Sequence, residues 1–211
     1  LAASTRARGY RSEIIDALPL SMKNDKLADE IVLKAPRYVG ISACTMDIEA
    51  GEDLARRLKK LNKEIVTIVG GPHVTALPED TMRNGKDFDF AVIGEGEEAV
   101  AELLDSLEGR SGKDLNEVEG IIFRDGEKLV RTAQRKFIKD LDSLPLPAWD
   151  LLPDLKKFYF APPWTMHSGN TATIITSRGC PFQCIYCDRK VFGNVVRSHG
   201  AGYVMKMIKT L

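Results

Sequence analysis

The first half of the chain alternates short apolar runs with longer stretches whose apolar residues recur at helical spacing. Residues 38–43 and 65–69 are apolar on both faces, which is typical of strands buried inside a parallel sheet. Between them, residues 47–61 place an apolar stripe opposite a row of arginines and lysines, as in an amphipathic helix. This alternation predicts an α/β fold: a Rossmann- or flavodoxin-like parallel sheet with helices on both faces.

The same patterns, with glycine and proline as stop signals, predict the remaining elements. The expected strands are 11–16, 38–43, 65–69, 90–93 and 171–176, and the expected helices are 24–34, 47–61, 78–84, one ending near 107, and 203–211. Residues 120–130 predict a hairpin with Asp125 and Gly126 at its turn. Residues 1–9 are typical of the end of a helix that stops at Gly9.

Changes in composition divide the chain into three parts. Residues 1–135 form the sheet domain with the hairpin at its end, 136–168 a linker rich in proline and aromatic residues, and 169–211 the start of a second domain. Prolines favour extended, semi-rigid chain, but Trp149, Phe158 and Trp164 are too apolar for a free tether. We therefore expect the linker, including Pro162-Pro163, to pack against one or both domains.

Composition and charge exclude several classes of protein. The 211 residues carry 30 lysines and arginines and 30 aspartates and glutamates, so the net charge favours neither a nucleic-acid nor a membrane partner. No apolar run approaches the roughly 18 residues of a membrane span. Four cysteines, three of them clustered, indicate a metal site in a reducing compartment rather than a disulfide framework. We expect a cytoplasmic protein.

The clustered cysteines are the strongest chemical signal in the sequence. Cys180, Cys184 and Cys187 are spaced C-x3-C-x2-C directly after an apolar run, so that their thiolates can converge on one soft metal centre. Three thiolates would leave one iron of a [4Fe–4S] cluster open to a further ligand. The alternative is a zinc knuckle that adds His199 to the cysteines. Cys44 is expected to be a small buried residue rather than a fourth ligand.

The cysteine segment resembles the cluster-binding loop after the first barrel strand of radical S-adenosylmethionine (SAM) enzymes. The resemblance includes Tyr186 before the last cysteine, and Gly179 and Pro181 beside the first. It implies a [4Fe–4S] cluster on the three cysteines, with SAM chelated at the open iron, contacted by Tyr186, and cleaved to a 5′-deoxyadenosyl radical. It also implies a partial (β/α) barrel and an electron donor such as flavodoxin or ferredoxin.

Polar or glycine-rich residues follow three of the expected strands, at 42–45, 70–73 and 94–97. Ligands of parallel sheets bind at the carboxyl ends of the strands. The set resembles the cobalamin-binding domain that precedes the barrel in many radical SAM enzymes. The resemblance implies that the residues bordering cobalamin are Ser42, Thr45, Gly70, Gly71, Gly94, Glu95 and Gly96.

Each stretch also has a simpler interpretation. Gly94 to Ala99 fits the dinucleotide pattern G-x-G-x-x-A, but three glutamates would stand where a pyrophosphate binds. Gly70 and Gly71 before a proline fit an ordinary turn. His73 fits a hydrogen-bonded loop histidine better than a cobalt ligand. The segment of the related cobalamin domains that carries the lower-ligand histidine has no counterpart in this sequence, so the ligand of the cobalt stays open.

The resemblance implies methyl transfer to an unactivated centre of a small-molecule substrate. Ring chemistry of the anaerobic tetrapyrrole cyclase type, a radical SAM enzyme with an empty Rossmann-like adaptor, and a zinc-binding interaction module are the alternatives. The resemblance covers essentially the whole chain and points to a longer protein. We therefore expect this chain alone to be inactive, strands 11–16 and 38–43 to lack the partner between them, and an apolar face to be incompletely covered. The residues of that face are Ile174, Ile175, Val204 and Ile208.

Overall fold

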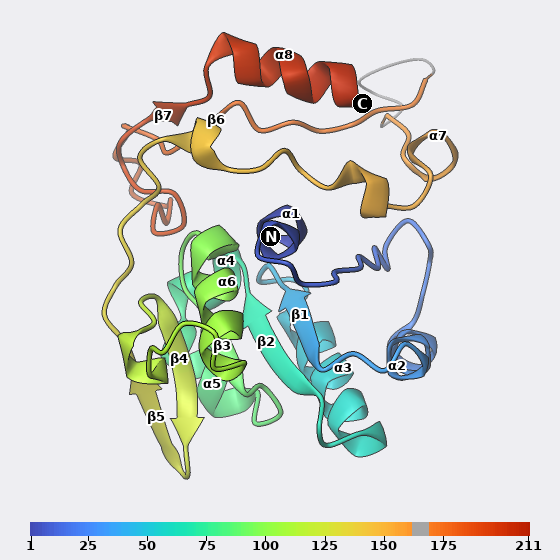
Figure 1. Ribbon diagram of the computed structural model, residues 1–211, viewed down its shortest axis with the longest axis vertical. Helices are drawn as coiled ribbons and strands as arrows, with labels where there is room; N and C mark the ends of the chain where they lie inside the picture. Colours follow the sequence, from blue (N-terminus) through green and yellow to red (C-terminus); the bar gives the residue numbers. More distant parts are fainter. Residues whose placement is uncertain (162–168) are drawn as a thin grey trace.

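The computed structural model describes residues 1–161 and 169–211 and forms an α/β domain with a C-terminal segment above it (Figure 1). The sheet has the order β1(Tyr38–Ser42), β2(Val66–Gly70), β3(Phe90–Val92), β4(Ile121–Asp125) and β5(Lys128–Arg131). Strands β1 to β3 run parallel, and β4 and β5 join them antiparallel. The predicted Rossmann-like fold class is confirmed, with the hairpin extending the sheet.

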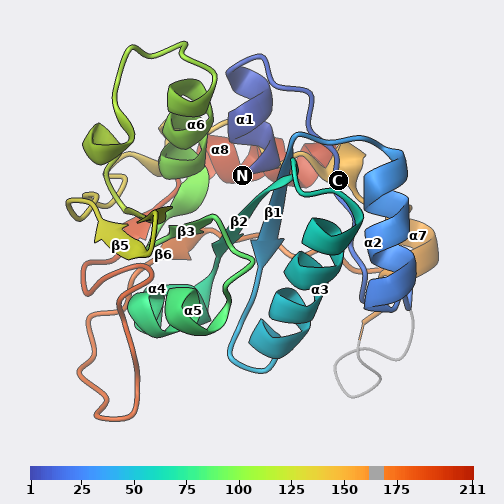
Figure 2. The ribbon, with the colours of Figure 1, turned by 90° about the horizontal axis from the view of Figure 1, so that it is seen from below.

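Helices cover both faces of this sheet (Figure 2). Helices α1(Ala2–Ala7) and α6(Gly96–Leu107) lie on one face, and α3(Ile48–Leu61), α4(Pro72–Ala76) and α5(Pro78–Asn84) lie on the other. Helix α2(Asn24–Leu33) packs beside α3 through Leu27, Ile31 and Leu58. Two further apolar clusters fill the space between the sheet and its two helical layers, so that the core is divided by the sheet.

Two expected strands are wrong. Residues 11–16 and 171–176 belong to no strand, because they lack the repeated backbone hydrogen bonds to a neighbour that a strand requires. Strand β1 is the edge of the sheet, with β2 on one side only. In the C-terminal segment the pairing falls further along, between β6(Ser177–Arg178) and β7(Arg197–Ser198), and α8(Ala201–Thr210) follows.

The linker lies against both parts of the molecule over its described residues. Ile138 and Leu141 are buried, and Tyr203 of α8 donates a hydrogen bond to the carbonyl of Leu144 at 3.1 Å. Farther along, Tyr159 donates to Asp16 at 2.7 Å, close to α7(Leu155–Phe158). The expected packing of Pro162-Pro163 and Trp164 lies outside the described residues. Short 3-10 turns at Leu115–Glu117, Leu141–Ser143 and Trp149–Leu151 complete the chain.

The expected apolar face of the C-terminal segment is partly open. Ile175 and Ile208 are 53% and 50% exposed, while Ile174 and Val204 are half-buried. Over residues 1–161 and 169–211, none of the helices has the length and the apolar character needed to cross a bilayer.

One close backbone approach holds the carboxyl ends of β1 and β2 together. The amide of Ala43 donates to the carbonyl of Gly70 at 2.9 Å, and Gly71 follows with φ +114° and ψ −175°. A Cβ atom on Gly71 would lie 2.6 Å from the carbonyl oxygen of Ala43. Gly71 is therefore required by the packing of the two loops, and not only by its own dihedral angles.

We expect Gly71→Ala to lower the free energy of unfolding by about 3 kcal/mol or more, because the added Cβ meets backbone in a conformation that is almost restricted to glycine. Gly94→Ala is the control, since Gly94 also has positive φ, +79°, but no atom lies within 4 Å of the added Cβ. Gly94→Ala should lower the free energy of unfolding by only about 1 to 2 kcal/mol. Urea unfolding followed by circular dichroism compares the two; equal losses would contradict the role of the close approach.

Candidate functional site

The loops after β1, β2 and β3 meet at the carboxyl edge of the sheet and are joined by hydrogen bonds. The hydroxyl of Thr75 donates to the carbonyl of Gly71 at 3.0 Å and accepts from the amide of Gly94 at 3.0 Å. Because Gly71 also abuts Ala43, all three loops are linked in one layer. The structure therefore brings the sequence-predicted residues Ser42, Gly70 and Gly94 to the same edge, as the parallel strands require.

This edge presents polar groups and open backbone. Ser42 and Thr45 are exposed, and the Thr45 hydroxyl lies 3.2 Å from Nδ1 of His73. Cys44 is half-buried and donates to Asp47 at 2.6 Å. A Cβ atom on Gly94 would have no atom within 4 Å apart from its chain neighbours, so this side of the backbone is open. Hydroxyl donors and side-chain-free backbone of this kind fit a large polar cofactor that lies against the edge.

Two of the residues that were predicted to contact cobalamin, Gly96 and Glu95, make other contacts in the structure. A Cβ atom on Gly96 would lie 2.9 Å from the side chain of Leu1, so this glycine makes room for α1 against α6. The carboxylate of Glu95 is buried and accepts from the backbone amide of Ile138 at 2.8 Å. It also pairs with the guanidinium groups of Arg178 and Arg197, each at 3.0 Å. Glu95 therefore faces the C-terminal segment with its side chain.

Glu97 adds a second carboxylate to this contact. It lies 2.6 Å from Nη2 of Arg178 and is largely buried. Burial alone raises the pKa of Glu97, but the hydrogen bond and positive charge of Arg178 outweigh it, so that the pKa lies below the usual 4.5. Neither arginine was singled out from the sequence, although both flank the cysteine loop.

The three clustered cysteines lie on the loop between β6 and β7. The base of this loop is tight: the amide of Cys180 donates to the carbonyl of Gly193 at 3.2 Å, and a Cβ on Gly179 would meet the backbone of Val195. Toward the tip, the amide of Cys187 donates to the carbonyl of Cys184 at 3.2 Å, and all three cysteines are exposed.

The sulfur atoms are not yet gathered around one centre. Among residues 1–161 and 169–211, no three cysteine, histidine, aspartate or glutamate side chains are grouped closely enough to hold a metal ion. Tyr186, the predicted SAM contact, is 89% exposed at the same loop. The donor set fits a soft metal centre, because three free thiols lie on one accessible loop.

His199 is held away from this loop. Its Nδ1 lies 2.8 Å from Oδ1 of Asp142, and its ring stacks on Tyr203 with centroids 4.3 Å apart. The imidazole is 6% exposed. Because the ring is packed against α8 and bonded to the linker, this arrangement argues against the zinc knuckle that would recruit His199.

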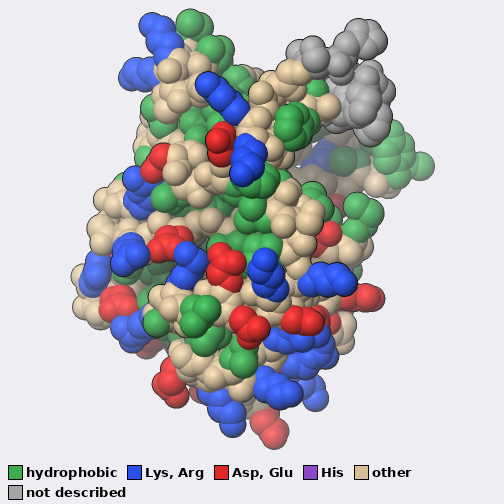
Figure 3. Space-filling model, turned by 90° about the vertical axis from the view of Figure 1, so that its right-hand side faces the viewer, with side chains coloured by type: hydrophobic (Ala, Val, Ile, Leu, Met, Phe, Trp, Pro, Cys, Tyr) green, Lys and Arg blue, Asp and Glu red, His purple; other side chains and the backbone are tan. Residues whose placement is uncertain are grey.

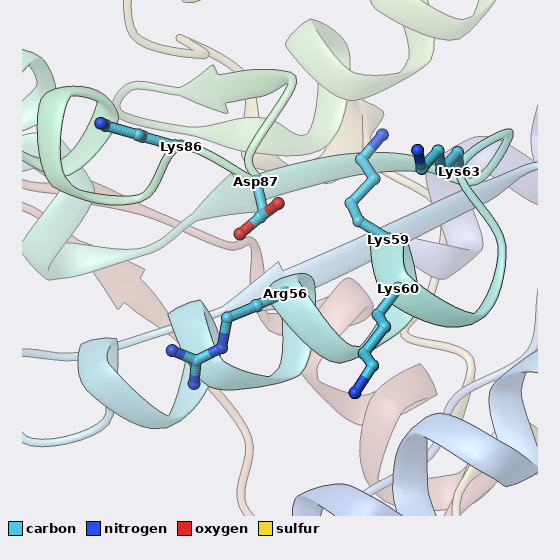
Figure 4. Close-up of a pocket in the computed structure, with 6 residues that line it drawn as sticks. All are labelled: Arg56, Lys59, Lys60, Lys63, Lys86 and Asp87. Atoms are coloured by element: carbon cyan, nitrogen blue, oxygen red, sulfur yellow. The ribbon is translucent and has the colours of Figure 1, made fainter.

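One hollow lies away from the carboxyl edge, and another borders the contact of Glu97 with Arg178. A shallow groove of about 570 Å³ borders the end of α3 (Figure 4), where Lys59 is paired with Asp89 at 2.6 Å. The groove is lined by Arg56, Lys59, Lys60, Lys63, Lys86 and Asp87. Acidic side chains are interspersed with basic ones over one face of the domain (Figure 3), as on an ordinary solvated surface. The second, a cavity of about 250 Å³, lies between α1, the linker and α8, where Glu97 and Arg178 line it together with Tyr203.

The comparisons with known proteins agree with this geometry. The family model for the B12 binding domain matches residues 1–104. An uncharacterized methyltransferase of Pyrococcus horikoshii is 33% identical over 200 residues, which is 94% of this chain and 42% of that protein. An anaerobic magnesium-protoporphyrin IX monomethyl ester cyclase of Rubrivivax gelatinosus is 31% identical over 215 residues, covering 100% of this chain and 38% of that protein.

Residues 1–104 thus match the B12 binding domain, and the chain is similar over nearly its whole length to a methyltransferase and a cyclase. It spans about two fifths of the length of these curated relatives. The methyltransferase TsrM from Kitasatospora setae, whose structure contains cobalamin and a [4Fe–4S] cluster, has the same fold: the TM-score is 0.72 at 15% identity, over 100% of this chain and 42% of that one. The cobalamin-dependent SAM radical enzyme OxsB has a TM-score of 0.70 at 19% identity, and the match covers 89% of this chain and 24% of that one.

The pKa of Glu97 predicts an acid-sensitive contact between the two parts of the chain. A carboxyl whose pKa is lowered in the folded state adds stability above its unfolded pKa and loses it as the pH falls through the folded value. Glu97→Gln should therefore be less stable than the wild type at pH 7, and its stability should fall less steeply below pH 4.5. Urea unfolding at a series of pH values measures both.

Glu127→Gln is the control for this comparison, because Glu127 is exposed in the turn between β4 and β5. Identical pH profiles for Glu97→Gln and the wild type would contradict the contribution of the Glu97–Arg178 pair.

Proposed function

We propose that this chain provides the cobalamin and cluster sites of an enzyme that cleaves SAM reductively and transfers a methyl group to an unactivated centre. The observation that supports this most is the buried contact of Glu95 with Arg178 and Arg197, which fixes the base of the cysteine loop beside the loop that follows β3. The match to the B12 binding domain supports cobalamin as a cofactor, and the curated methyltransferase relative supports the reaction.

The residues of the chain divide into two groups in this proposal. Cys180, Cys184 and Cys187 hold a [4Fe–4S] cluster, and Tyr186 contacts SAM at the tip of the same loop. Ser42 and Thr45 donate hydrogen bonds to cobalamin, while Gly70, Gly71 and Gly94 present backbone to it. When bound, the cluster would supply an open iron and an electron to SAM, and cobalamin would carry the methyl group.

Ring formation of the cyclase type is the second candidate, because the cyclase of Rubrivivax gelatinosus aligns with the whole chain at 31% identity. The two functions are separated by supplying the full-length protein with SAM labelled in its methyl group. Label in the product supports methyl transfer, whereas a product without label supports ring chemistry. A small-molecule substrate, a flavodoxin or ferredoxin as electron donor, and a cytoplasmic location stay predictions.

The cluster is tested by anaerobic reconstitution of the full-length protein with iron and sulfide. The wild type should bind about four irons per chain at this site. Serine at Cys180, Cys184 or Cys187 should abolish binding, because each removes one of three thiolates. Cys44→Ser is the matched control and should retain the cluster, since Cys44 lies at the sheet edge, bonded to Asp47. Loss of iron in the control would overturn the assignment, and zinc in place of iron would support the interaction module.

The cobalamin site is tested by filling the open space beside Gly94. Gly94→Val places a branched side chain where the cofactor would lie, so corrinoid affinity of the full-length protein should fall about 100-fold or more. Gly126→Val is the control: Gly126 also has positive φ and open surroundings but lies in the β4–β5 turn. It should keep wild-type affinity.

Corrinoid absorption after equilibrium dialysis measures the binding of both variants. Equal affinities would contradict the proposed position of the cofactor. A wild type that binds the cluster but no corrinoid would support the empty adaptor.

A further inference from the structure

Four charged side chains form a buried group between the sheet domain and the C-terminal segment. This charge cluster consists of Glu95 and Glu97 on one side and Arg178 and Arg197 on the other. Glu95 lies 3.0 Å from each guanidinium, and Glu97 lies 2.6 Å from Arg178. The Glu95 side chain is only 2% exposed, and those of the two arginines 10% each. Two negative and two positive charges balance, which makes their burial tolerable.

The two arginines come from opposite ends of the cysteine loop. Arg178 ends β6, Arg197 begins β7, and the two residues are register partners in the antiparallel pair. Like charges directly opposite one another destabilise a strand pair. The carboxylate of Glu95, which contacts both guanidiniums, compensates this repulsion. The two ends of the cysteine loop are therefore closed by a residue of the other domain.

Both arginines also contact Phe192 within the cysteine loop, but these contacts do not reach the tip of the loop. Arg197 donates to the carbonyl of Phe192 at 2.9 Å, and Arg178 lies over the ring of Phe192 at 5.5 Å. By contrast, Phe182 and Ile185 near the cysteines are 70% and 102% exposed. The loop thus has a base that is fixed by the sheet domain and a tip that makes few contacts of its own.

We propose that the charge cluster sets the position of the cysteine loop over the carboxyl edge of the sheet, with Glu95 and Arg197 as positioning residues. Glu95 directly follows Gly94, whose amide is bonded to the loop after β2. Any displacement of the carboxyl-edge loops is therefore passed to the base of the cysteine loop through two carboxylates, that of Glu95 next to Gly94 and that of Glu97 on α6. The significance of the charge cluster for catalysis rests on the proposed function. Its role in connecting the carboxyl-edge loops to the cysteine loop does not.

A variant without the Glu95 charge should open the loop base and leave the sheet intact. In Glu95→Gln, two register-paired arginines would face one remaining carboxylate, so the β6–β7 pair should separate more often. Hydrogen exchange of the full-length protein, read by mass spectrometry, should show about tenfold faster exchange in residues 177–198. Residues 66–92 should exchange at the wild-type rate.

The chain offers a matched control on the helix that follows Glu95. Glu102 of α6 pairs with Arg135 at 2.5 Å, with side chains 22% and 11% exposed, but does not contact the cysteine loop. Glu102→Gln should leave exchange in residues 177–198 unchanged. Unchanged exchange there in Glu95→Gln, or an equal increase in Glu102→Gln, would overturn the proposal.

A double-mutant cycle tests whether Glu95 and Arg197 act through each other. Arg197→Gln alone should also speed hydrogen exchange at the loop base. In the double variant the loss of protection from exchange should be smaller than the sum of the two single losses, because neither Glu95 nor Arg197 is then left as an unpaired buried charge. Additive effects would contradict the coupling.

A second readout separates this inference from the proposed function. Iron binding after reconstitution should be retained in Glu95→Gln, because all three thiolates are present, whereas the electron paramagnetic resonance spectrum of the reduced cluster should broaden as the loop samples several positions. If no cluster forms in the wild type, the proposed function fails while the exchange result still decides the role of the charge cluster. A sharp, wild-type spectrum in Glu95→Gln would overturn the positioning role.

Discussion

The buried carboxylate of Glu95 is the interaction on which the relation between the two parts of the chain depends. It lies in the loop after β3 and joins two arginines that would otherwise repel each other across the β6–β7 pair. On its other side, the adjacent Gly94 is bonded through Thr75 to Gly71, and Gly71 abuts Ala43. A continuous series of contacts therefore runs from the end of β1 to the base of the cysteine loop.

This arrangement explains why order and exposure differ so sharply along the cysteine loop. Its base is held by ion pairs, by the Gly193 carbonyl and by the Phe192 ring, whereas its tip carries exposed thiols and exposed apolar side chains. A tip of this kind has little to stabilise it except a ligand of its own sulfur atoms. In the proposed enzyme, the protein fixes where the cluster forms, and the metal completes the loop.

The sheet was predictable from the sequence because strands β1 to β3 and the β4–β5 hairpin carry their own signals: apolar runs, and an Asp-Gly turn. Residues 11–16 contain only two apolar residues, Ile14 and Ile15, and form no strand, since pairing depends on a neighbour that local sequence does not reveal. The cysteines, and the gathering of Ser42, Gly70 and Gly94 at one edge, also follow from motif and strand direction. The role of Glu95 does not, because nothing in Gly94-Glu95-Gly96 shows that arginines 83 and 102 residues away in the chain compensate its charge.

The most direct test of this account is the magnetic interaction between the two cofactors in the full-length protein, prepared with cob(II)alamin and a reduced cluster. If the cysteine loop lies over the carboxyl edge of the sheet, the two spins are close, and the electron paramagnetic resonance signal of the cobalt is split or broadened when the cluster is reduced. A spectrum equal to the sum of the two isolated centres would contradict the account.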